Sequence, residues 1–334
     1  MAAGKGERLK GITHSLPKAL VQVAGKTLLE YAINRFVKAG VQNIIIAVGW
    51  KSNLIKDAVP QFESTTEIKI IDVSNYEIGP LQTLATALEA TQNEESIVCP
   101  VDLLISSDSI SEIVSHHTEI QDTLVTLAVD TQSASGSTVS LDSHGHVLGV
   151  QREIDSADSL AKSAMFMVIS SQFLEYCKKA LSGGATTAVS VLNHVIEEKR
   201  LVKSYSVNER WFDIDTLADV LEANRYLLES SAVQFEKAVF IPSGDIVDIG
   251  ENLHLRSEIK VGNGVTLKGP CLIQSGSIIG SNCIIGPHAC VGFGTLIGDE
   301  CEIKNAVISG QSKVPDHSKL SDILMSRSEI FRME

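Results

Sequence analysis

The sequence predicts a two-domain protein of the α/β class, with a mostly parallel sheet over residues 1–232 and a solenoid of short strands over residues 240–325. In the first part, apolar runs typical of strands alternate at short intervals with segments of helical periodicity. In the last part, an aliphatic residue returns every six positions. The length of 334 residues accommodates two domains of ordinary size.

Composition and charge exclude several classes of function. Hydrophobic residues make up 44% of the chain and charged residues 21%, which supplies a sizeable buried core. The net charge of −13 argues against nucleic acid or an anionic membrane surface as a partner. The sequence shows no signal peptide and no apolar run of about 18 residues. We therefore expect a cytoplasmic protein whose six cysteines are reduced thiols.

The predicted elements of the first domain follow one another in βαβ order. Residues 27–38 have apolar side chains at helical spacing, whereas residues 43–49 form a continuous β-branched run typical of a buried strand. Further helices are expected from residue 52 and over residues 81–90, 172–181, 187–199 and 215–228. Further strands are expected over residues 68–73, 96–101, 123–129, 138–141, 147–151, 164–169 and 201–207, with a hairpin turn at 142–145.

A strict hexapeptide period predicts the second domain. Ten aliphatic residues are spaced six apart: Ile249, Leu255, Val261, Leu267, Ile273, Ile279, Ile285, Val291, Ile297 and Ile303. Four positions after each of them comes a mostly small or β-branched residue, and three of these are Cys271, Cys283 and Cys301. Such a period is typical of a solenoid in which each turn buries its edge on the next. We interpret these cysteines as small core side chains rather than metal ligands or redox groups.

The first nine residues are the leading candidate for a binding loop. Small residues and cations are concentrated here: Ala2, Ala3, Gly4, Lys5, Gly6 and Arg8. Glycine lets backbone N–H groups approach a phosphate closely, and a helix N-terminus beyond the loop favours negative charge. A plain strand-to-helix turn is the alternative interpretation.

Together with Pro17-Lys18, this loop resembles the A-A-G-x-G-x-R-[LM]…P-K signature of the nucleotidyltransferases that load sugar-1-phosphates or alcohol phosphates onto an NTP. The resemblance implies a Rossmann-like domain in which the loop binds the phosphates of the NTP. One departure concerns the sheet, because members of the family have an apolar strand before the A-A-G and this sequence opens at Met1. Either the start is truncated or a central strand is absent.

Three aspartates are candidates for a metal site. Asp102 ends an apolar run, and ligands of open α/β sheets bind at the carboxyl ends of strands. Asp213 and Asp215 share one face of an extended segment, where two carboxylates repel each other unless a cation lies between them. In the family, the acid at the place of Asp102 holds the catalytic Mg²⁺. The alternatives are a loop acid and helix caps, with Thr216 as a further cap.

Two further pairs of residues match binding positions of the same family. Gln82 and Thr83 occupy the place of the loop that identifies the base, with a helix cap as the alternative for Thr83. Arg152, and more weakly Lys162, stand where relatives hold the acceptor phosphate through a lysine. A surface arginine is the alternative for Arg152. The histidines at positions 116 and 117 are expected on a solvated helix surface.

The resemblance extends along most of the chain. Residues 211–216 resemble the motif W-x-D-[IV]-G-T, with Asp215 in place of the glycine, which is more typical of the branch that makes CDP-alcohols. The repeats resemble the left-handed parallel β-helix of hexapeptide-repeat proteins, with a little over three coils. Residues 314–324 resemble a segment of archaeal-type bifunctional proteins that join such a domain to an acetyltransferase β-helix.

The function implied by the resemblance is the reaction of an NTP with a sugar-1-phosphate or alcohol phosphate to give an NDP product and pyrophosphate. Arg8 and the loop amides would hold the leaving pyrophosphate, and Lys18 would hold phosphate oxygens. Asp102, Asp213 and Asp215 would hold Mg²⁺. The alternatives are an inactive regulatory or scaffold homologue and an acetyltransferase acting through the β-helix. We expect a homo-oligomer, and the sequence leaves the base and the acceptor open.

Overall fold

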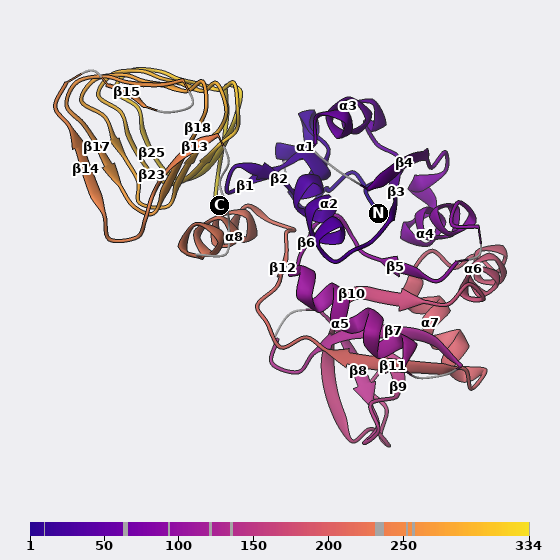
Figure 1. The fold of residues 1–334 in the computed structure, drawn as a ribbon. Coiled ribbons are helices and arrows are strands. Elements are labelled where there is room, and N and C mark those ends of the chain that lie inside the picture. The colour runs from indigo at the N-terminus through magenta and orange to yellow at the C-terminus, as the bar shows by residue number, and fades with distance from the viewer. Residues whose placement is uncertain are drawn as a thin grey trace. The chain divides into compact units, whose positions relative to one another are not determined.

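The computed structural model describes residues 1–9, 11–62, 66–92, 94–119, 122–133, 136–230, 237–251, 253–255 and 258–333 (Figure 1). Its internal contacts divide the chain into two compact units. The first comprises Met1–Lys5, Pro17–Ala19 and Leu29–Asp213. The second comprises Gly6–Leu16, Leu20–Leu28 and Ile214–Glu334. The division is therefore not one cut in the sequence, because two short N-terminal segments belong to the second unit.

Two sheets form the centre of the first unit. A small parallel sheet consists of β3 (Asn43–Val48) and β4 (Glu67–Asp72). The larger sheet contains β5 (Ser96–Val98), β7 (Thr123–Asp130), β8 (Ser137–Leu141), β9 (Val147–Val150), β10 (Ser159–Ile169) and β11 (Leu201–Ser206). A further short pair consists of β6 (Leu103–Leu104) and β12 (Phe212–Asp213), which run antiparallel.

The larger sheet is mixed, so the prediction of a mostly parallel sheet is wrong for the described strands. β11 and β7 are parallel, but β10 runs antiparallel to β5, β7 and β8, and β8 is antiparallel to β9. The predicted hairpin explains part of this difference. β8 and β9 are joined by a short turn in which Gly145 has a φ of 75°, and a short turn can connect only antiparallel strands.

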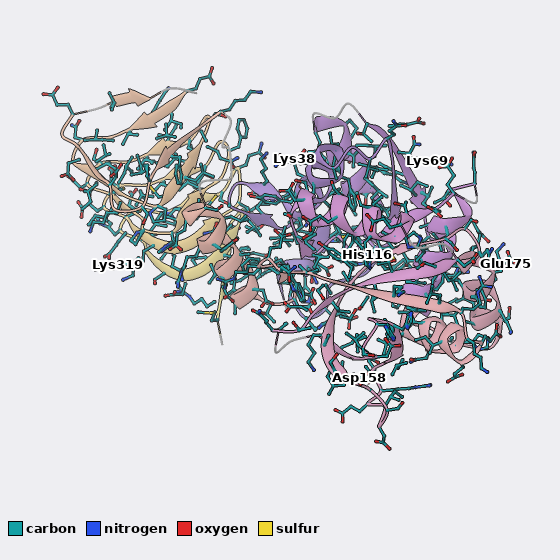
Figure 2. The ribbon with its side chains drawn as sticks, turned by 60° about the horizontal axis from the view of Figure 1, so that its bottom comes forward. Lys38, Lys69, His116, Asp158, Glu175 and Lys319 are labelled. Carbon is teal, nitrogen blue, oxygen red and sulfur yellow. The ribbon has the colours of Figure 1, made fainter. Side chains whose placement is uncertain are left out.

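Helices cover both sheets, close to the segments that the periodicity predicts. They are α2 (Leu28–Lys38), α3 (Ser52–Ala58), α4 (Pro80–Glu89), α5 (Ser107–Thr118), α6 (Phe173–Ser182) and α7 (Ala188–Glu197). Short 3₁₀ helices are η1 (Lys18–Leu20), η2 (Val59–Gln61) and η3 (Tyr76–Ile78). Figure 2 shows His116 on α5, the helix that packs on β7 and β10.

The prediction of a solvated histidine pair is wrong for His117. Its side chain is only 3% exposed, and its Nδ1 lies 2.8 Å from the Thr126 hydroxyl of β7. His117 is rotated by about 100° around the helix axis from His116, so the two side chains lie on different faces of α5. The face with His117 is the one that packs on the sheet.

The second unit is built from short strands. The N-terminal segments contribute α1 (Ile12–Ser15), β1 (Gln22–Val23) and β2 (Lys26–Thr27), and α8 (Leu217–Glu229) follows β12. The remaining strands are β13 (Ala238–Ile241), β14 (Ile246–Ile249), β15 (Leu253–Leu255), β16 (Ile259–Val261), β17 (Val265–Lys268), β18 (Cys271–Gln274), β19 (Ile278–Ile279), β20 (Ile284–Ile285), β21 (Ala289–Val291), β22 (Leu296–Ile297), β23 (Glu302–Ile308), β24 (Lys313–Val314), β25 (Lys319–Ser326) and β26 (Glu329–Arg332).

These strands stack in parallel at the interval that the hexapeptide period implies. Thr266 pairs with Ile284, and Ile284 pairs with Glu302, which is 18 residues at each step. The interval falls to 17 residues afterwards, as Glu302 pairs with Lys319. The first repeats depart from the pattern, because β13, β14 and β15 pair antiparallel with β18, β17 and β16. The prediction of parallel coils over all ten hexapeptides is therefore wrong for the first strands, β14 and β15.

The interior of this stack is formed by the residues that the period selects. Val261, Ile273, Ile285 and Ile303 are at most 3% exposed. The three cysteines at the small positions are also buried and form no disulfide. Burial raises the pKa of the Cys271 thiol to about 12, which keeps it protonated and unreactive. The interpretation of these cysteines as small core side chains is confirmed.

Candidate active site

The N-terminal segment enters the first unit as a very short piece of strand. The Ala2 N–H donates to the carbonyl oxygen of Ala47 in β3 at 2.8 Å. On the other side, the Val101 N–H donates to the carbonyl oxygen of Met1 at 3.1 Å. The segment therefore lies between β3 and the end of β5, and it delivers the loop that follows to the carboxyl ends of these strands. In open α/β sheets, ligands bind at this edge.

The loop has the backbone freedom that close approach to a ligand requires. Gly6 has a φ of 66°, a conformation that favours glycine. A Cβ on Gly4 would meet no atom within 4 Å, so its backbone faces open space. Lys5 forms an ion pair with Glu77 of η3 at 2.8 Å, a partner that the sequence patterns do not reveal. The helix beyond the loop, α1, has only four residues, so the expected contribution of a helix N-terminus is small.

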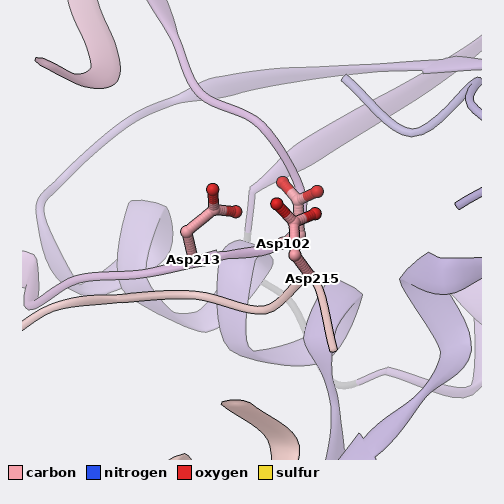
Figure 3. Close-up of side chains that lie close together, drawn as sticks. All are labelled: Asp102, Asp213 and Asp215. Carbon is pink, nitrogen blue, oxygen red and sulfur yellow. The ribbon is translucent and has the colours of Figure 1, made fainter. Parts of the chain in front are cut away.

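Three carboxylates meet where β6 pairs with β12. Asp102 directly precedes β6, and Asp213 lies in β12 opposite Leu103. Asp215 follows Asp213 by two residues. Figure 3 shows the three side chains together, and an oxygen from each lies within 4.8 Å of the others. Carboxylate oxygens at this separation fit a hard divalent cation such as Mg²⁺. The structure thus brings together the three acids that the sequence singles out.

Two cations are paired with these acids. The Lys18 ammonium forms an ion pair with Asp102, and the two side chains are only 10% and 21% exposed. Arg8 binds Asp215 at 2.5 Å, but its own side chain is 77% exposed. Lys18 is therefore fixed by its surroundings, whereas most of the Arg8 side chain remains in solvent. A phosphate ligand would compete for both cations with the acids that now hold them.

The turn after β12 is held by a capping box at the start of α8. The Asp219 carboxylate accepts hydrogen bonds from the backbone N–H groups of Asp215 and Thr216, at 3.0 and 2.7 Å. In return, the Asp219 N–H donates to the Thr216 hydroxyl at 3.3 Å. The cap predicted at Thr216 is therefore present, and it fixes the backbone of Asp215. The pattern T-x-x-D is readable in the sequence as a capping box.

A tryptophan fixes the chain just before these acids. The Trp211 indole N–H donates to a carboxylate oxygen of Asp130, at the end of β7, at 2.9 Å. This contact ties the segment that carries Asp213 to the larger sheet. No sequence pattern pairs these residues, because they lie 81 positions apart. Asp130 therefore contributes to the position of the acids without being one of them.

The residues expected to identify the base lie on α4. Gln82 is partly exposed and donates through its Nε2 to the Thr86 hydroxyl at 3.2 Å. Thr83 is only 5% exposed. The N-cap of α4 is Gly79, so the alternative interpretation of Thr83 as the cap of this helix is wrong. The sequence predicts this helix from residue 81, whereas it begins at Pro80. Proline is well tolerated at the first position of a helix, so Pro80 does not mark the end of the preceding loop.

The two cations expected at the acceptor phosphate have partners in the larger sheet and its helices. Arg152 follows β9 and forms an ion pair with Glu197 of α7 at 2.7 Å. Its side chain is 53% exposed. Lys162 lies in β10 and donates to the Thr138 hydroxyl of β8 at 3.0 Å. Neither contact involves one of the three acids, in contrast to the contacts of Lys18 and Arg8.

Comparison with known proteins identifies the family. A model of the MobA-like NTP transferase domain matches residues 1–195. The chain belongs to this family. Bifunctional protein GlmU of Methanocaldococcus jannaschii is 25% identical over 98% of this chain and 77% of its own length. The bifunctional sugar-1-phosphate nucleotidylyltransferase/acetyltransferase of Sulfurisphaera tokodaii is 25% identical over 99% of this chain and 79% of its own.

Two further similarities are more distant. The low-salt glycan biosynthesis nucleotidyltransferase Agl11 of Haloferax volcanii is 23% identical over 70% of this chain and 66% of its own length. The crystal structure of UDP-glucose pyrophosphorylase complexed with UDP-glucose superposes with a TM-score of 0.58 at 16% identity. It covers 67% of this chain and 95% of that chain, and at this identity it shows the fold alone.

Proposed function

We propose that this MobA-like NTP transferase forms an NDP-sugar, or a CDP-alcohol-type product, together with pyrophosphate. The substrates would be an NTP and a sugar-1-phosphate or related phosphate monoester. The observation that carries the proposal is the cluster of Asp102, Asp213 and Asp215 with its paired cations Lys18 and Arg8. The Sulfurisphaera tokodaii relative, which matches 99% of this chain, is named a bifunctional sugar-1-phosphate nucleotidylyltransferase/acetyltransferase, and this name supports the same reaction.

The reaction is a displacement at phosphorus in which the protein mainly positions groups and neutralises charge. An oxygen of the acceptor phosphate attacks the α-phosphorus, and the bond from that phosphorus to the bridging oxygen breaks, so pyrophosphate leaves with the electron pair. Arg8 and the amides of the glycine loop would hold the pyrophosphate. Lys18 would hold phosphate oxygens across the site. Arg152 and Lys162 would bind the acceptor, and Gln82 and Thr83 would contact the base.

A divalent cation completes the charge balance of this site. The cation would be Mg²⁺, held by Asp102 and Asp213 and by Asp215. When bound, it would neutralise negative charge on the phosphates. The three acids carry three negative charges, and Lys18 and Arg8 offset two of them, so one negative charge remains to favour a cation. Binding of the triphosphate would draw the two cations away and increase that attraction.

The second unit is proposed to be a left-handed parallel β-helix that supports a homo-oligomer. The 18-residue interval of its parallel strand pairs supports the β-helix, because three hexapeptides then make one coil. We place the protein in the cytoplasm, which agrees with its six buried free thiols. The domain boundaries proposed are residues 1–232 and 240–325, and the segments 6–16 and 20–28 pack with the second unit.

Release of pyrophosphate from a panel of NTPs, with and without Mg²⁺, tests the proposed reaction. Asp102→Ala and Arg8→Ala should each lower turnover by at least about 100-fold, because the first removes a ligand of the proposed cation and the second removes a charge that would hold the pyrophosphate. Asp72→Asn is the matched control, since Asp72 is an exposed acid of β4 that pairs with Lys56. Wild-type rates in either variant would contradict the proposal. A folded protein that uses no NTP would indicate a regulatory homologue instead.

Acetyl transfer is a second candidate activity. The Sulfurisphaera tokodaii relative is named as an acetyltransferase as well, and its match to 99% of this chain includes the second unit. An increase in thermal stability on addition of acetyl-CoA would support this activity. An unchanged unfolding temperature at millimolar acetyl-CoA would argue against it.

A further inference from the structure

A tight turn of the N-terminal region packs within the second unit. β1 and β2 form a hairpin with only Ala24 and Gly25 between them, and both strands belong to the segment Leu20–Leu28 of that unit. The two turn residues have φ values of 43° and 80°. Two-residue hairpins favour such a turn, and glycine adopts it readily. For Ala24 the conformation is unfavourable, so it persists because the surrounding structure holds it.

Asn224 of α8 holds this turn from one side. Its side chain is completely buried, and its Oδ1 accepts a hydrogen bond from the Ala24 N–H at 3.0 Å. Its Nδ2 donates to the carbonyl oxygen of His288 at 3.1 Å. Asn224 therefore joins two backbone segments that lie 200 and 64 positions from it along the chain. Burial of an amide is favourable only when such bonds form, so both contacts are needed.

The stacked strands hold the same turn from another side. The Gln274 Nε2 of β18 donates to the carbonyl oxygen of Gly25 at 2.8 Å. A Cβ on Gly25 would lie only 2.7 Å from the Cδ2 of Leu272, so the backbone of the turn lies directly against β18. Ala24 belongs to one buried apolar cluster with Leu272 and Cys290. Residues of α8 and of the stacked strands thus fix the turn together.

The chain between this turn and Lys18 is buried almost throughout. Of residues 18–23, all except Gln22 are at most 9% exposed. Gln22 is itself held, because its Oε1 accepts a hydrogen bond from the Gly310 N–H at 3.2 Å. The Leu28 N–H donates to the carbonyl oxygen of Val21 at 3.0 Å and closes the hairpin just after η1. A close-packed stretch of this kind transmits a displacement of the turn to Lys18.

We propose that Asn224 is a positioning residue for the transfer reaction, acting through the turn at residues 24–25 on Lys18. The inference rests on the proposed function, in which Lys18 holds phosphate oxygens. Binding of an NTP would draw Lys18 away from Asp102, and its buried backbone then determines where the ammonium lies. A misplacement of about 1 Å in a group that orients a reacting phosphate costs up to roughly 100-fold in rate. Gln274 should act in the same direction from β18.

Hydrogen exchange tests whether Asn224 holds the segment, independently of any activity. Asn224→Ala should speed exchange of the Leu28 amide by at least about 10-fold, because the hairpin that this amide closes loses its anchor. Asn193→Ala is the matched control, since Asn193 is a buried asparagine whose amide binds both backbone groups of Val150. An unchanged rate at Leu28 would overturn the proposal, whether or not the chain uses an NTP.

A second variant keeps this test decisive if Asn224→Ala does not fold. Gln274→Met removes the other side-chain hydrogen bond to the turn and leaves the buried asparagine in place. It should also speed exchange at Leu28, by at least about 3-fold. The rate of the intact protein in this variant would count against the anchoring of the turn by the second unit.

A double-mutant cycle tests whether the effect passes through Lys18. With ATP, GTP, CTP and UTP as the probes, Asn224→Ala should lower kcat/KM for the accepted NTP by roughly 10-fold. In a chain that carries Lys18→Ala, the same change should alter kcat/KM by less than about 2-fold, because no ammonium is left to misplace. Calorimetric titration with the NTP gives the same cycle from binding where turnover is too slow to follow.

The outcomes separate this inference from the proposed function. Equal losses of kcat/KM with and without Lys18 would overturn the inference, because they would indicate a general loss of structure. A chain that neither binds nor turns over any of the four NTPs would overturn the proposed function, and with it the role of Asn224 in the reaction. Faster exchange at Leu28 in that case would still show that Asn224 anchors the turn.

Discussion

Lys18 and Arg8 differ in how strongly the protein holds them, although both pair with acids of the candidate metal site. The Lys18 side chain is 10% exposed and that of Arg8 is 77% exposed. A buried ammonium loses its hydration, so removing its partner leaves an uncompensated charge. An exposed guanidinium regains water when its partner is removed. The two ion pairs should therefore have different effects on stability.

Stability measurements can separate these two pairs. Asp102→Asn should lower the free energy of unfolding by roughly 1–3 kcal/mol, because it removes the Asp102 charge from beside the mostly buried Lys18 ammonium. Arg8→Ala should lower it by less than about 1 kcal/mol. Urea unfolding followed by circular dichroism measures both. Equal losses in the two variants would show that the burial of Lys18 does not matter.

His117 should make stability depend on pH. Its burial lowers the pKa of the imidazole, with smaller effects from Glu95 and His116. Below its ordinary value of about 6.5, the unfolded chain then binds a proton more readily than the folded chain. The contribution of the neutral imidazole is full above that pH and is lost as the pH falls towards the folded value.

A variant isolates this effect. As the pH falls from about 6.5 to 5, the free energy of unfolding should decrease less in His117→Gln than in the unchanged protein, because glutamine does not titrate. His144→Gln is the control, since His144 is exposed in the turn after β8. Chemical unfolding at a series of pH values measures the slopes. A slope unchanged by His117→Gln would contradict the assignment.

At the scale of elements, the start of α8 links helix stability to the acids. Its capping box consists of Thr216 and Asp219, and the Asp219 carboxylate also accepts a hydrogen bond from the backbone N–H of Asp215, so the start of the helix and the position of this acid depend on the same side chain. The end of β12 fixes Asp213 in the same way, through pairing with β6. Short elements with little core of their own therefore position this site.

Removal of the cap should destabilise α8. Thr216→Ala and Asp219→Ala should each cost about 1 kcal/mol of unfolding free energy. The double variant should cost less than the sum, because both side chains serve one capping box. Urea unfolding of the three variants measures this coupling, and strictly additive losses would argue against a shared box. Ser111→Ala, on the exposed surface of α5, is the control.

At the scale of the whole molecule, each of the two units has a hydrophobic core of its own. Leu192 is fully buried in the core formed by α4, α6, α7 and the larger sheet. Ile285 is fully buried inside the stacked strands of the second unit. No helix in the described ranges is long and apolar enough to cross a bilayer. The independent cores predict independent unfolding.

Calorimetry tests this independence. Leu192→Ala and Ile285→Ala should each cost about 2–5 kcal/mol, because each opens a cavity in a close-packed interior. Each variant should lower the temperature of a different unfolding transition and leave the other in place. A single transition that moves equally in both variants would show that the two cores unfold as one.

The sequence by itself determined the features that depend on local periodicity. Helical spacing located α2, α6 and α7, and the six-residue period identified the interior residues of the second unit. The acids of the candidate site could also be selected from the sequence. Asp102 ends an apolar run, and Asp213 and Asp215 are two positions apart in an extended segment, so they share one face. Such patterns arise from the geometry of one chain segment and need no knowledge of its partners.

Only the tertiary structure decided which segments meet and in which direction. It set β10 antiparallel to its neighbours, turned His117 into the core and joined Lys18 to Asp102 across 84 positions. It also reversed the pairing of the first strands of the second unit, although their hexapeptide spacing is unchanged. Spacing along a chain fixes which side chains share a face, whereas pairing direction and long-range ion pairs depend on packing between distant segments, which a local pattern does not encode.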